Sequence, residues 1–242
     1  MAESVGIFNM NKINSILLAA LLLACSYTSA RAQDRLEADL SMDLVSSYVW
    51  RGMYQGSVAL QPEVSLGWKG LSLSAWGSAG LADKMYEVDL TLSYSIAGFT
   101  LSVTDLWSNT DMPRYFEYRP MVTGHCFEGA VAYDFGPVKL SWQTIFAGND
   151  FQQADGRRTF SSYFEISAPF RLGGLDWEAA AGMVPWASDY YATKSFNVIN
   201  VSLEAKKSIP ITDRFGLPVF GRLIANPCSG NLYFVAGLTI KI

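Results

Sequence analysis

The chain has 242 residues, of which 50% are hydrophobic, 14% aromatic and 17% charged, and its formal net charge is −4. A nucleic-acid-binding protein would carry a basic stripe; here the Lys and Arg residues are scattered, which excludes nucleic acid as a partner. One His and three Cys leave little material for a His- or Cys-rich metal site, and we expect no cofactor and no metal.

The first residues are typical of a secretory signal. Lys12 supplies a weakly positive start, the stretch from Ile16 to Cys25 is apolar but too short to span a bilayer, and Ala30-Arg31-Ala32 is a small-x-small cleavage site. We therefore predict a signal peptide over residues 1–32, with residues 1–9 as an upstream start extension. The mature chain, residues 33–242, then begins at Gln33.

Two alternatives for this segment stay open. Leu22-Leu23-Ala24-Cys25 resembles a lipoprotein cleavage box, although small residues continue past Cys25 to the conventional site. The segment also has the length of a buried N-terminal helix in a globular domain. Because the apolar surplus after residue 35 is spread over short pieces, no other candidate for a transmembrane helix is present in the sequence.

The mature region repeats segments of about ten residues that alternate apolar and polar side chains, which is the signature of a transmembrane β-barrel. In the last segment, Leu232, Phe234 and Leu238 fall on one face, while Tyr233 and Lys241 fall on the other. The alternation predicts an antiparallel up-and-down barrel of twelve strands, near residues 37–51, 60–69, 71–81, 85–96, 99–109, 116–134, 138–148, 158–171, 175–186, 195–208, 216–225 and 231–242.

The connections fall into two classes. Tight glycine turns follow the second, fourth, sixth and eighth segments, at Lys69-Gly70, Ala97-Gly98, Phe135-Gly136-Pro137 and Leu172-Gly173-Gly174. Longer polar loops follow most odd segments, as at 108–114 and 148–157. Short periplasmic turns and long external loops are typical of outer-membrane barrels, so both termini are predicted to be periplasmic. The stretch 208–215, with Pro210 and Asp213, is predicted as the one longer periplasmic turn.

A soluble β-sandwich or lipocalin-like barrel would also alternate, but its outer face would be rich in Lys and Glu. Here the polar face carries Ser, Thr, Asp and Glu with few charges. Aromatic residues on the predicted apolar faces would form interfacial girdles; these are Tyr48, Trp50, Trp68, Trp142 and Trp177. This distribution favours the bacterial outer membrane, with lipid as the outside partner.

The segment Ser47-Tyr48-Val49-Trp50-Arg51-Gly52-Met53 resembles the Tyr-x-x-Arg-Gly opening of the TorF-type porin family. In that family a Pro, a Trp-x-Ser segment and an acidic strand follow, and Gln61-Pro62, the stretch 73–78 and Glu87-Val88-Asp89 fit those places. The resemblance covers roughly residues 40–95. It implies a porin-like channel with an unassigned substrate and no catalytic residues. The chain departs from many outer-membrane barrels by ending on Ile242 in place of Phe.

Sixteen charged residues fall on the lumen side when alternate positions are counted along the predicted strands. They are our candidate pore-lining residues. The acids are Asp39, Asp43, Glu63, Asp89, Glu128, Asp134, Glu165, Asp176, Glu178 and Glu204, and the bases are Arg51, Lys69, Lys139, Lys206, Arg222 and Lys241. Because charged rings set pore selectivity, this acidic excess predicts a modest preference for cations or neutral solutes. Alternatively, the groups pair across the lumen; for Arg51 we favour a structural ion pair that orders the rim.

His125 is the one candidate for a catalytic base, as in envelope lipid hydrolases. By parity it faces lipid, and no Gly-x-Ser-x-Gly elbow is present; we therefore predict no catalytic, cofactor-binding or metal-binding residues and no enzyme. Cys126 lies within a strand and Cys228 in the last loop, and a disulfide would need the loop to fold inward. The tyrosines at 115–118 and 189–191 fit interface anchoring better than sugar stacking.

The sequence therefore predicts an outer-membrane porin-like channel for passive diffusion of small solutes. Twelve strands lie between eight, which side chains fill, and sixteen, which leave a channel, so a narrow or blocked lumen is compatible with the pattern. A non-conducting structural or surface-binding barrel is the alternative, and an outer-membrane lipid hydrolase is a weaker one. The oligomeric state has no signal in the sequence.

Overall fold

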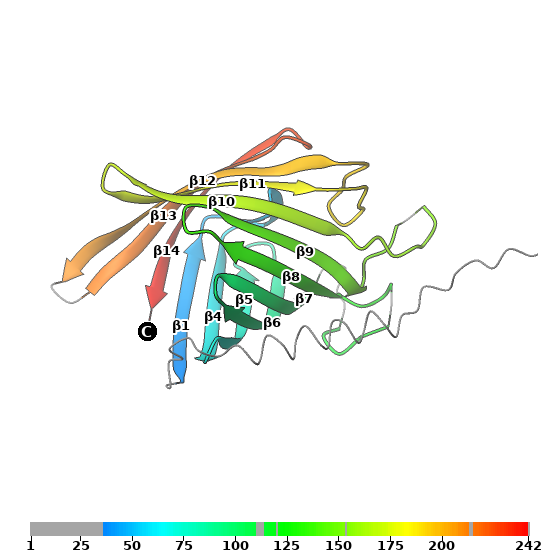
Figure 1. Ribbon diagram of the computed structural model, residues 1–242, viewed down its shortest axis with the longest axis horizontal. Coiled ribbons are helices and arrows are strands. Elements are labelled where there is room, and N and C mark those ends of the chain that lie inside the picture. Colours follow the sequence, from blue (N-terminus) through cyan, green and yellow to red (C-terminus); the bar gives the residue numbers. More distant parts are fainter. Residues whose placement is uncertain (1–35, 110–113, 120, 153, 213–214, 242) are drawn as a thin grey trace, which may run out of the picture. The chain divides into compact units, whose positions relative to one another are not determined.

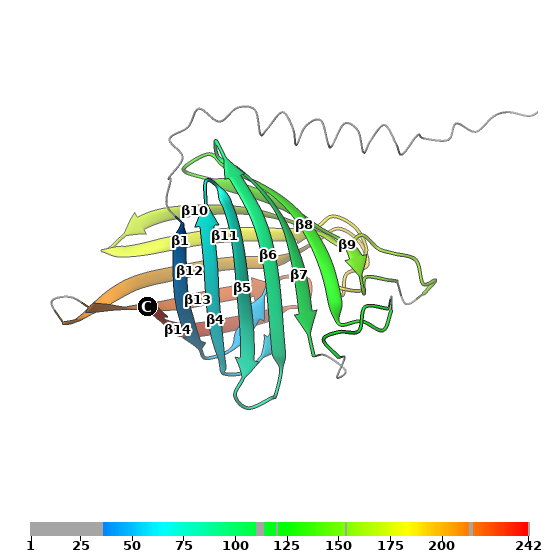
Figure 2. The ribbon, with the colours of Figure 1, turned by 90° about the horizontal axis from the view of Figure 1, so that it is seen from below.

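The computed structural model describes residues 36–109, 114–119, 121–152, 154–212 and 215–241, and the predicted signal peptide lies outside them. Twelve strands form a closed antiparallel barrel in the order β1-β14-β13-β12-β11-β10-β9-β8-β7-β6-β5-β4 (Figures 1 and 2). They are β1 (Glu37–Val45), β4 (Ala59–Trp68), β5 (Leu71–Gly80), β6 (Tyr86–Ile96), β7 (Phe99–Ser108), β8 (His125–Asp134), β9 (Lys139–Gly148), β10 (Ser162–Leu172), β11 (Leu175–Val184), β12 (Asn197–Thr212), β13 (Phe215–Asn226) and β14 (Asn231–Lys241).

The barrel closes where the first strand pairs with the last. Ser41 of β1 lies opposite Lys241 of β14, and Val45 lies opposite Gly237. The other edge of β1 pairs with β4, from Glu37 opposite Gly67 to Val45 opposite Ala59. Closure leaves no free strand edge in the ring, which a bilayer requires of a β-protein. The predicted fold class and strand number are confirmed.

Two remaining strands, β2 (Tyr48–Trp50) and β3 (Met53–Gly56), form a separate two-stranded sheet. The sequence prediction of one strand over residues 37–51 is therefore wrong, because the wall strand ends at Val45. Ser46 ends the wall pairing: its backbone N–H donates to Ala236 O at 2.8 Å, and its Oγ accepts from Ala236 N at 2.9 Å. The chain then leaves the wall.

Three other predicted boundaries are also corrected. The strand predicted over 116–134 begins only at His125, since Arg119 O accepts turn hydrogen bonds from Val122 N and Thr123 N. The strand predicted from residue 158 begins at Ser162. The stretch 208–215 is not a long turn, because β12 continues to Thr212 and β13 starts at Phe215.

The two ends of the barrel differ in their connections. We call the end with the turns at 69–70, 97–98, 135–138 and 173–174 the tight-turn end, and the end with the connections 46–58, 109–124, 149–161 and 185–196 the loop end. The predicted glycine turns are confirmed. Lys69 and Gly70 have φ of 51° and 85°, and Ala97 and Gly98 have 50° and 86°, the positive pair that a two-residue hairpin turn needs.

The outer face of the barrel is apolar. Its exposed side chains come from strands all around the ring, and they include Leu40, Val64, Leu66, Leu73, Leu92, Leu101, Val103, Val131, Ile166, Val201, Leu203, Leu223 and Phe234. The predicted girdle residues Trp68 and Trp142 are exposed on this face as expected. A surface this apolar has to be covered by lipid or protein.

Among the described residues, no helix is long and apolar enough to cross a bilayer.

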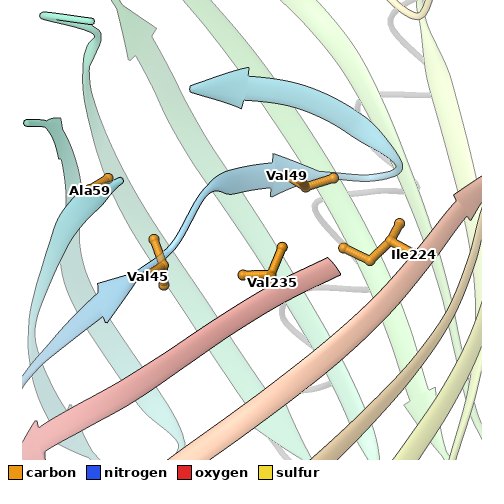
Figure 3. Packing of buried hydrophobic residues seen from close by; sticks show 5 residues of the cluster. All are labelled: Val45, Val49, Ala59, Ile224 and Val235. Carbon is orange, nitrogen blue, oxygen red and sulfur yellow. The ribbon is translucent and has the colours of Figure 1, made fainter. Parts of the chain in front are cut away.

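Packing inside the barrel is concentrated where β2 meets the wall. Val49 of β2 points towards Ile224 of β13 and Val235 of β14, and Val45 and Ala59 complete this buried cluster (Figure 3). The neighbours of Ile224 and Val235 along their strands, Leu223 and Phe234, are exposed on the outer face. Because side chains alternate along a strand, Ile224 and Val235 face inward, and the β2–β3 sheet lies inside the barrel.

Candidate functional site: a hairpin inside the barrel

The residues Tyr48–Gly56, which we call the inner hairpin, form a tight two-stranded turn. Trp50 pairs with Met53, and Tyr48 pairs with Gly56. Between them Arg51 has φ of 48° and Gly52 has φ of 77°, which is the pair of positive values of a type I′ turn. The Arg-Gly pair of the sequence motif is therefore a turn that reverses the chain inside the barrel.

The inner hairpin crosses the lumen. In the closed ring of twelve strands, β9 lies six steps from β1 in either direction, and β8 and β10 flank it. Arg51 reaches these opposite strands: its two terminal nitrogens donate to Glu128 of β8 at 2.6 and 2.8 Å, and its guanidinium stacks over Tyr163 of β10, 4.7 Å from the ring centre. The hairpin enters between β1 and β4 and is fixed to the far wall.

The Arg51 side chain is almost completely saturated with partners. Besides Glu128, it donates to the hydroxyl of Tyr191 at 2.5 Å and lies 4.2 Å from the centre of the Trp50 ring. Only 13% of the Arg51 side chain and 7% of the Glu128 side chain are exposed. Burial raises the pKa of the Tyr191 phenol, although Arg51 opposes the shift. The predicted structural ion pair of Arg51 therefore exists, but across the lumen and not at the rim.

Gly52 makes the closest backbone approach. A Cβ on Gly52 would lie 1.9 Å from the carbonyl oxygen of Ile199 on β12, a distance that no side chain tolerates. The Gly52 carbonyl in turn accepts a hydrogen bond from Asn226 Nδ2 of β13 at 3.1 Å. Glycine is required here both for the positive φ and for the contact.

Aromatic rings surround the hairpin. Trp50 stacks on Tyr191 with ring centres 6.1 Å apart and meets Tyr190 edge-on at 6.1 Å, while Tyr48 lies 5.5 Å from Trp76 of β5. The expectation that Tyr48 and Trp50 face lipid is wrong. The prediction assumed that one strand runs through residue 51, but the strand stops at Val45. Beyond its end, the alternation of side chains no longer tells which face of the barrel a residue lies on.

Three cavities adjoin the hairpin, and Trp50 lines all of them. The outer cavity, of about 690 Å³, lies among the loop-end residues and β6–β8 and includes Glu87, Leu106, Cys126 and Tyr190. A first inner cavity of about 260 Å³ is lined by Asp43, Tyr48, Trp76 and Asp89, and a second of about 180 Å³ by Arg51, Glu165, Glu178 and Glu204. Trp50 is therefore the residue that the linings of all three cavities share.

The predicted pore-lining residues have different environments. Glu204 is paired with Lys206 Nζ at 2.6 Å and with the guanidinium of Arg222, and Glu165 accepts from the Tyr163 hydroxyl at 2.6 Å. Asp43, Asp89 and Glu178 line the inner cavities. On the face of Asp43, the register places Asp39, Glu63 and Lys241.

Four of the candidates lie at the tight-turn end. Lys69 is in the turn after β4, with its ammonium 5.2 Å from the centre of the Trp68 ring. Asp134 and Lys139 are the paired residues that close the β8–β9 connection, and Asp134 accepts from Gly136 N at 2.7 Å. Asp176 is bonded to exposed Arg171 at 2.6 Å. These groups lie away from the hairpin.

Sequence reasoning missed several residues of the site. Glu87 lies two positions before Asp89 on β6, so strict alternation would have placed it on the lumen face as well. Tyr163 follows the same rule, since it lies two positions before Glu165. Tyr191 was expected to anchor at the interface, and that expectation is wrong: it is buried, stacks on Trp50 and accepts a hydrogen bond from Arg51.

His125 lies outside this site. It is paired opposite Trp107, with no exposed surface. Its Nδ1 contacts Asp105 Oδ1 at 2.7 Å and its Nε2 contacts the carbonyl oxygen of Tyr115 at 2.5 Å, while Tyr118 stacks on the ring at 4.5 Å. Both ring nitrogens are thus occupied by acceptors other than a serine hydroxyl.

Cys126 and Cys228 are free thiols, the first buried and the second exposed. Cys126 Sγ contacts Asn149 O at 3.3 Å. Within the described ranges, no group of three His, Cys, Asp or Glu side chains is placed to hold a metal ion.

No protein-family model and no curated protein matches the chain, so the resemblance to the TorF-type family stays a prediction. Two solved structures are similar. One is described as the NanC porin, with 9% identity, a TM-score of 0.45, and coverage of 84% of this chain and 98% of that one. The other is OccK8 (OprE) of Pseudomonas aeruginosa, with 13% identity, a TM-score of 0.39, and coverage of 84% of this chain and 62% of that one.

Proposed function

We propose that the protein is an outer-membrane porin-like channel, with both termini periplasmic, through which small solutes diffuse passively. The observation that carries the proposal is that the outer face of the closed barrel is apolar whereas its interior is polar and charged. Large apolar side chains are exposed on the outside, and cavities with polar and charged lining lie on both sides of a hairpin in the lumen. Lipid would cover the first face and water would fill the second.

The charge pattern supports a modest preference for cations. Of the four described bases that line the cavities, three are neutralised: Arg51 by Glu128, Arg222 by Glu204 and Arg119 by Glu117. The fourth, Arg114, lines the outer cavity without an ion pair among the described residues. Several cavity-lining carboxylates have no ion pair among the described residues; these are Asp43, Glu87, Asp89 and Glu178. A lumen with unpaired negative charge concentrates cations over anions.

A non-conducting barrel is the second candidate, and the inner hairpin is the observation that favours it. Its tip is fixed to β8, β12 and β13, so the lumen is narrower than the strand number alone implies.

Planar-bilayer recording of the refolded mature protein separates the two candidates. A channel gives discrete single-channel openings, and its reversal potential in a KCl gradient has the sign of cation preference. Absence of discrete openings would reject the channel, and a reversal potential of anion sign would reject the charge preference.

A further inference from the structure

The inner hairpin divides the lumen unevenly. Towards β8, β10, β12 and β13 it is sealed against the wall. Arg51 is bonded to Glu128 and stacked on Tyr163, and Gly52 lies against the Ile199 carbonyl and is bonded by Asn226. Trp50 packs on Tyr190 and Tyr191 over the same half. No comparable backbone contact ties the hairpin to β6 among the described residues.

On the other half, cavities lie on both sides of the hairpin next to β6. Glu87 lines the outer cavity and Asp89 lines the first inner cavity. The two residues are two positions apart on one strand, so their side chains project from the same face roughly 7 Å apart. The Tyr48 hydroxyl lies near the Glu87 carboxyl group, and Trp76, opposite Asp89 in the register, packs on Tyr48.

We propose that the inner hairpin makes the selective step of permeation, in which a small cation passes between Trp50 and β6, from Glu87 to Asp89. This inference rests on the proposed channel function. Trp50 is the wall common to the two cavities and sets the width of the passage. The two carboxyl groups would supply its cation ligands, since Glu87 lines the cavity on one side of Trp50 and Asp89 the cavity on the other.

Asp89 is well suited to the inner side of the step. Its Oδ1 is buried and has no hydrogen-bond partner among the described residues. Burial without a donor favours the neutral carboxylic acid, and a cation entering the cavity would replace the proton and supply the missing partner. Glu87 begins the passage on the outer side, where it lines the outer cavity near Tyr48 of the hairpin.

The sealed half is less suited to the same step. Its main charges are paired, with Glu204 bound to Arg222 and Lys206, and Glu178 is the one carboxylate of its lining without a partner among the described residues. Glu165 is held by Tyr163 and by Asn200 Nδ2 at 3.3 Å.

The test measures cation-to-anion permeability ratios from reversal potentials in a KCl gradient. Asp89→Asn and Glu87→Gln should each lower the ratio at least about twofold, because each removes an ionisable carboxyl group from the passage. Glu178→Gln removes the same kind of group from the sealed-half cavity and should lower the ratio by less than half as much. Asp155→Asn, in an exposed loop, is the neutral control. Equal falls in Asp89→Asn and Glu178→Gln would overturn the β6 route.

The width of the passage has a separate readout. Trp50→Ala should raise single-channel conductance at least about twofold, while Trp68→Ala on the outer face should leave it unchanged. Trp50→Phe, which keeps a ring, provides the measurement if the alanine variant does not fold, and its increase should be smaller. Unchanged conductance in a folded Trp50 variant would overturn the inference while leaving the channel intact. A wild-type protein without openings would overturn the channel function and this step with it.

Discussion

The barrel wall and the inner hairpin are stabilised in different ways. The wall is a repeating ladder in which each strand pairs with two neighbours over many residues, so its stability is spread over many small contributions. The hairpin has two short strands and is held by a few contacts around Arg51 and Gly52. A substitution at one wall position should therefore be tolerated unless it places a charge on the apolar outer face, whereas a substitution at one hairpin contact should disturb the whole site.

The largest effect is expected from Glu128→Ala. It leaves the Arg51 guanidinium buried in the lumen without its carboxylate, and breaking a buried pair costs about 3–5 kcal/mol. The matched wall variant is Asp176→Ala, which breaks an ion pair whose side chains are 87% and 61% exposed; such a pair contributes at most about 1 kcal/mol. Urea unfolding of protein folded into lipid vesicles measures both. Equal losses would mean that the hairpin contact is no more important than a surface pair.

A charge on the lipid face comes next. Leu92 is 51% exposed on the outside of β6, and Leu92→Arg should destabilise the folded barrel by about 2–4 kcal/mol if that face lies within lipid. Ser93→Arg, at the adjacent position on the lumen side, should cost much less. If both variants unfold at the same urea concentration in vesicles, the outer face is not lipid-covered.

Gly52→Ala tests the close approach of the hairpin to β12. Any Cβ there meets the Ile199 carbonyl, so the hairpin must lift away from the wall. Gly230 offers a matched control, because its φ is +74° but nothing lies within 4 Å of the Cβ position. The backbone strain is thus common to the two variants, at about 1 kcal/mol, and Gly52→Ala should lose about 2 kcal/mol more in the same unfolding assay. Equal losses of unfolding free energy in the two variants would contradict the close approach of Gly52 to β12.

The smallest effect concerns a loop outside the wall. Arg119 donates to both carboxylate oxygens of Glu117 at 2.8 and 2.7 Å, and it lowers the pKa of Glu117 from 4.5 to about 2. Since the pKa is lowered in the folded state, the pair stabilises the loop above pH 4.5 and is lost as the pH falls towards 2. The ¹³C shift of the Glu117 carboxyl should titrate near 2, and near 4.5 in Arg119→Ala. A wild-type midpoint near 4.5 would contradict the pairing.

The same contrast explains what could be predicted from the sequence. The wall was predictable because alternation and glycine turns are local signals. Lys69-Gly70 and Ala97-Gly98 mark their turns without reference to the rest of the chain. The inner hairpin carries equally local signals, since Val49-Trp50 and Arg51-Gly52 read as the end of a strand and a turn. No local sequence signal indicates that the turn lies inside the barrel, because its position depends on contacts with Glu128 and Tyr163, which are far away in the sequence.

The charged residues divide in a similar way. Parity placed Asp89 and Glu165 on the lumen face without knowledge of the fold. It could not tell which carboxylates are paired, since Glu204 meets Arg222 only through the β12–β13 register. Parity failed at Tyr48 and Trp50 because the strand that it was counted along ends before them.

The most direct test of the central claim is the single-channel conductance of a protein that lacks the hairpin. Replacing residues 48–56 with a short Gly-Ser linker keeps all twelve strands of the wall and removes only the segment that crosses the lumen. We predict discrete openings several times larger than in the wild type, together with a weaker cation preference, because the wall carboxylates then line a wider passage. Openings of the same size and selectivity in both proteins would contradict the account, because the hairpin would then not limit the passage.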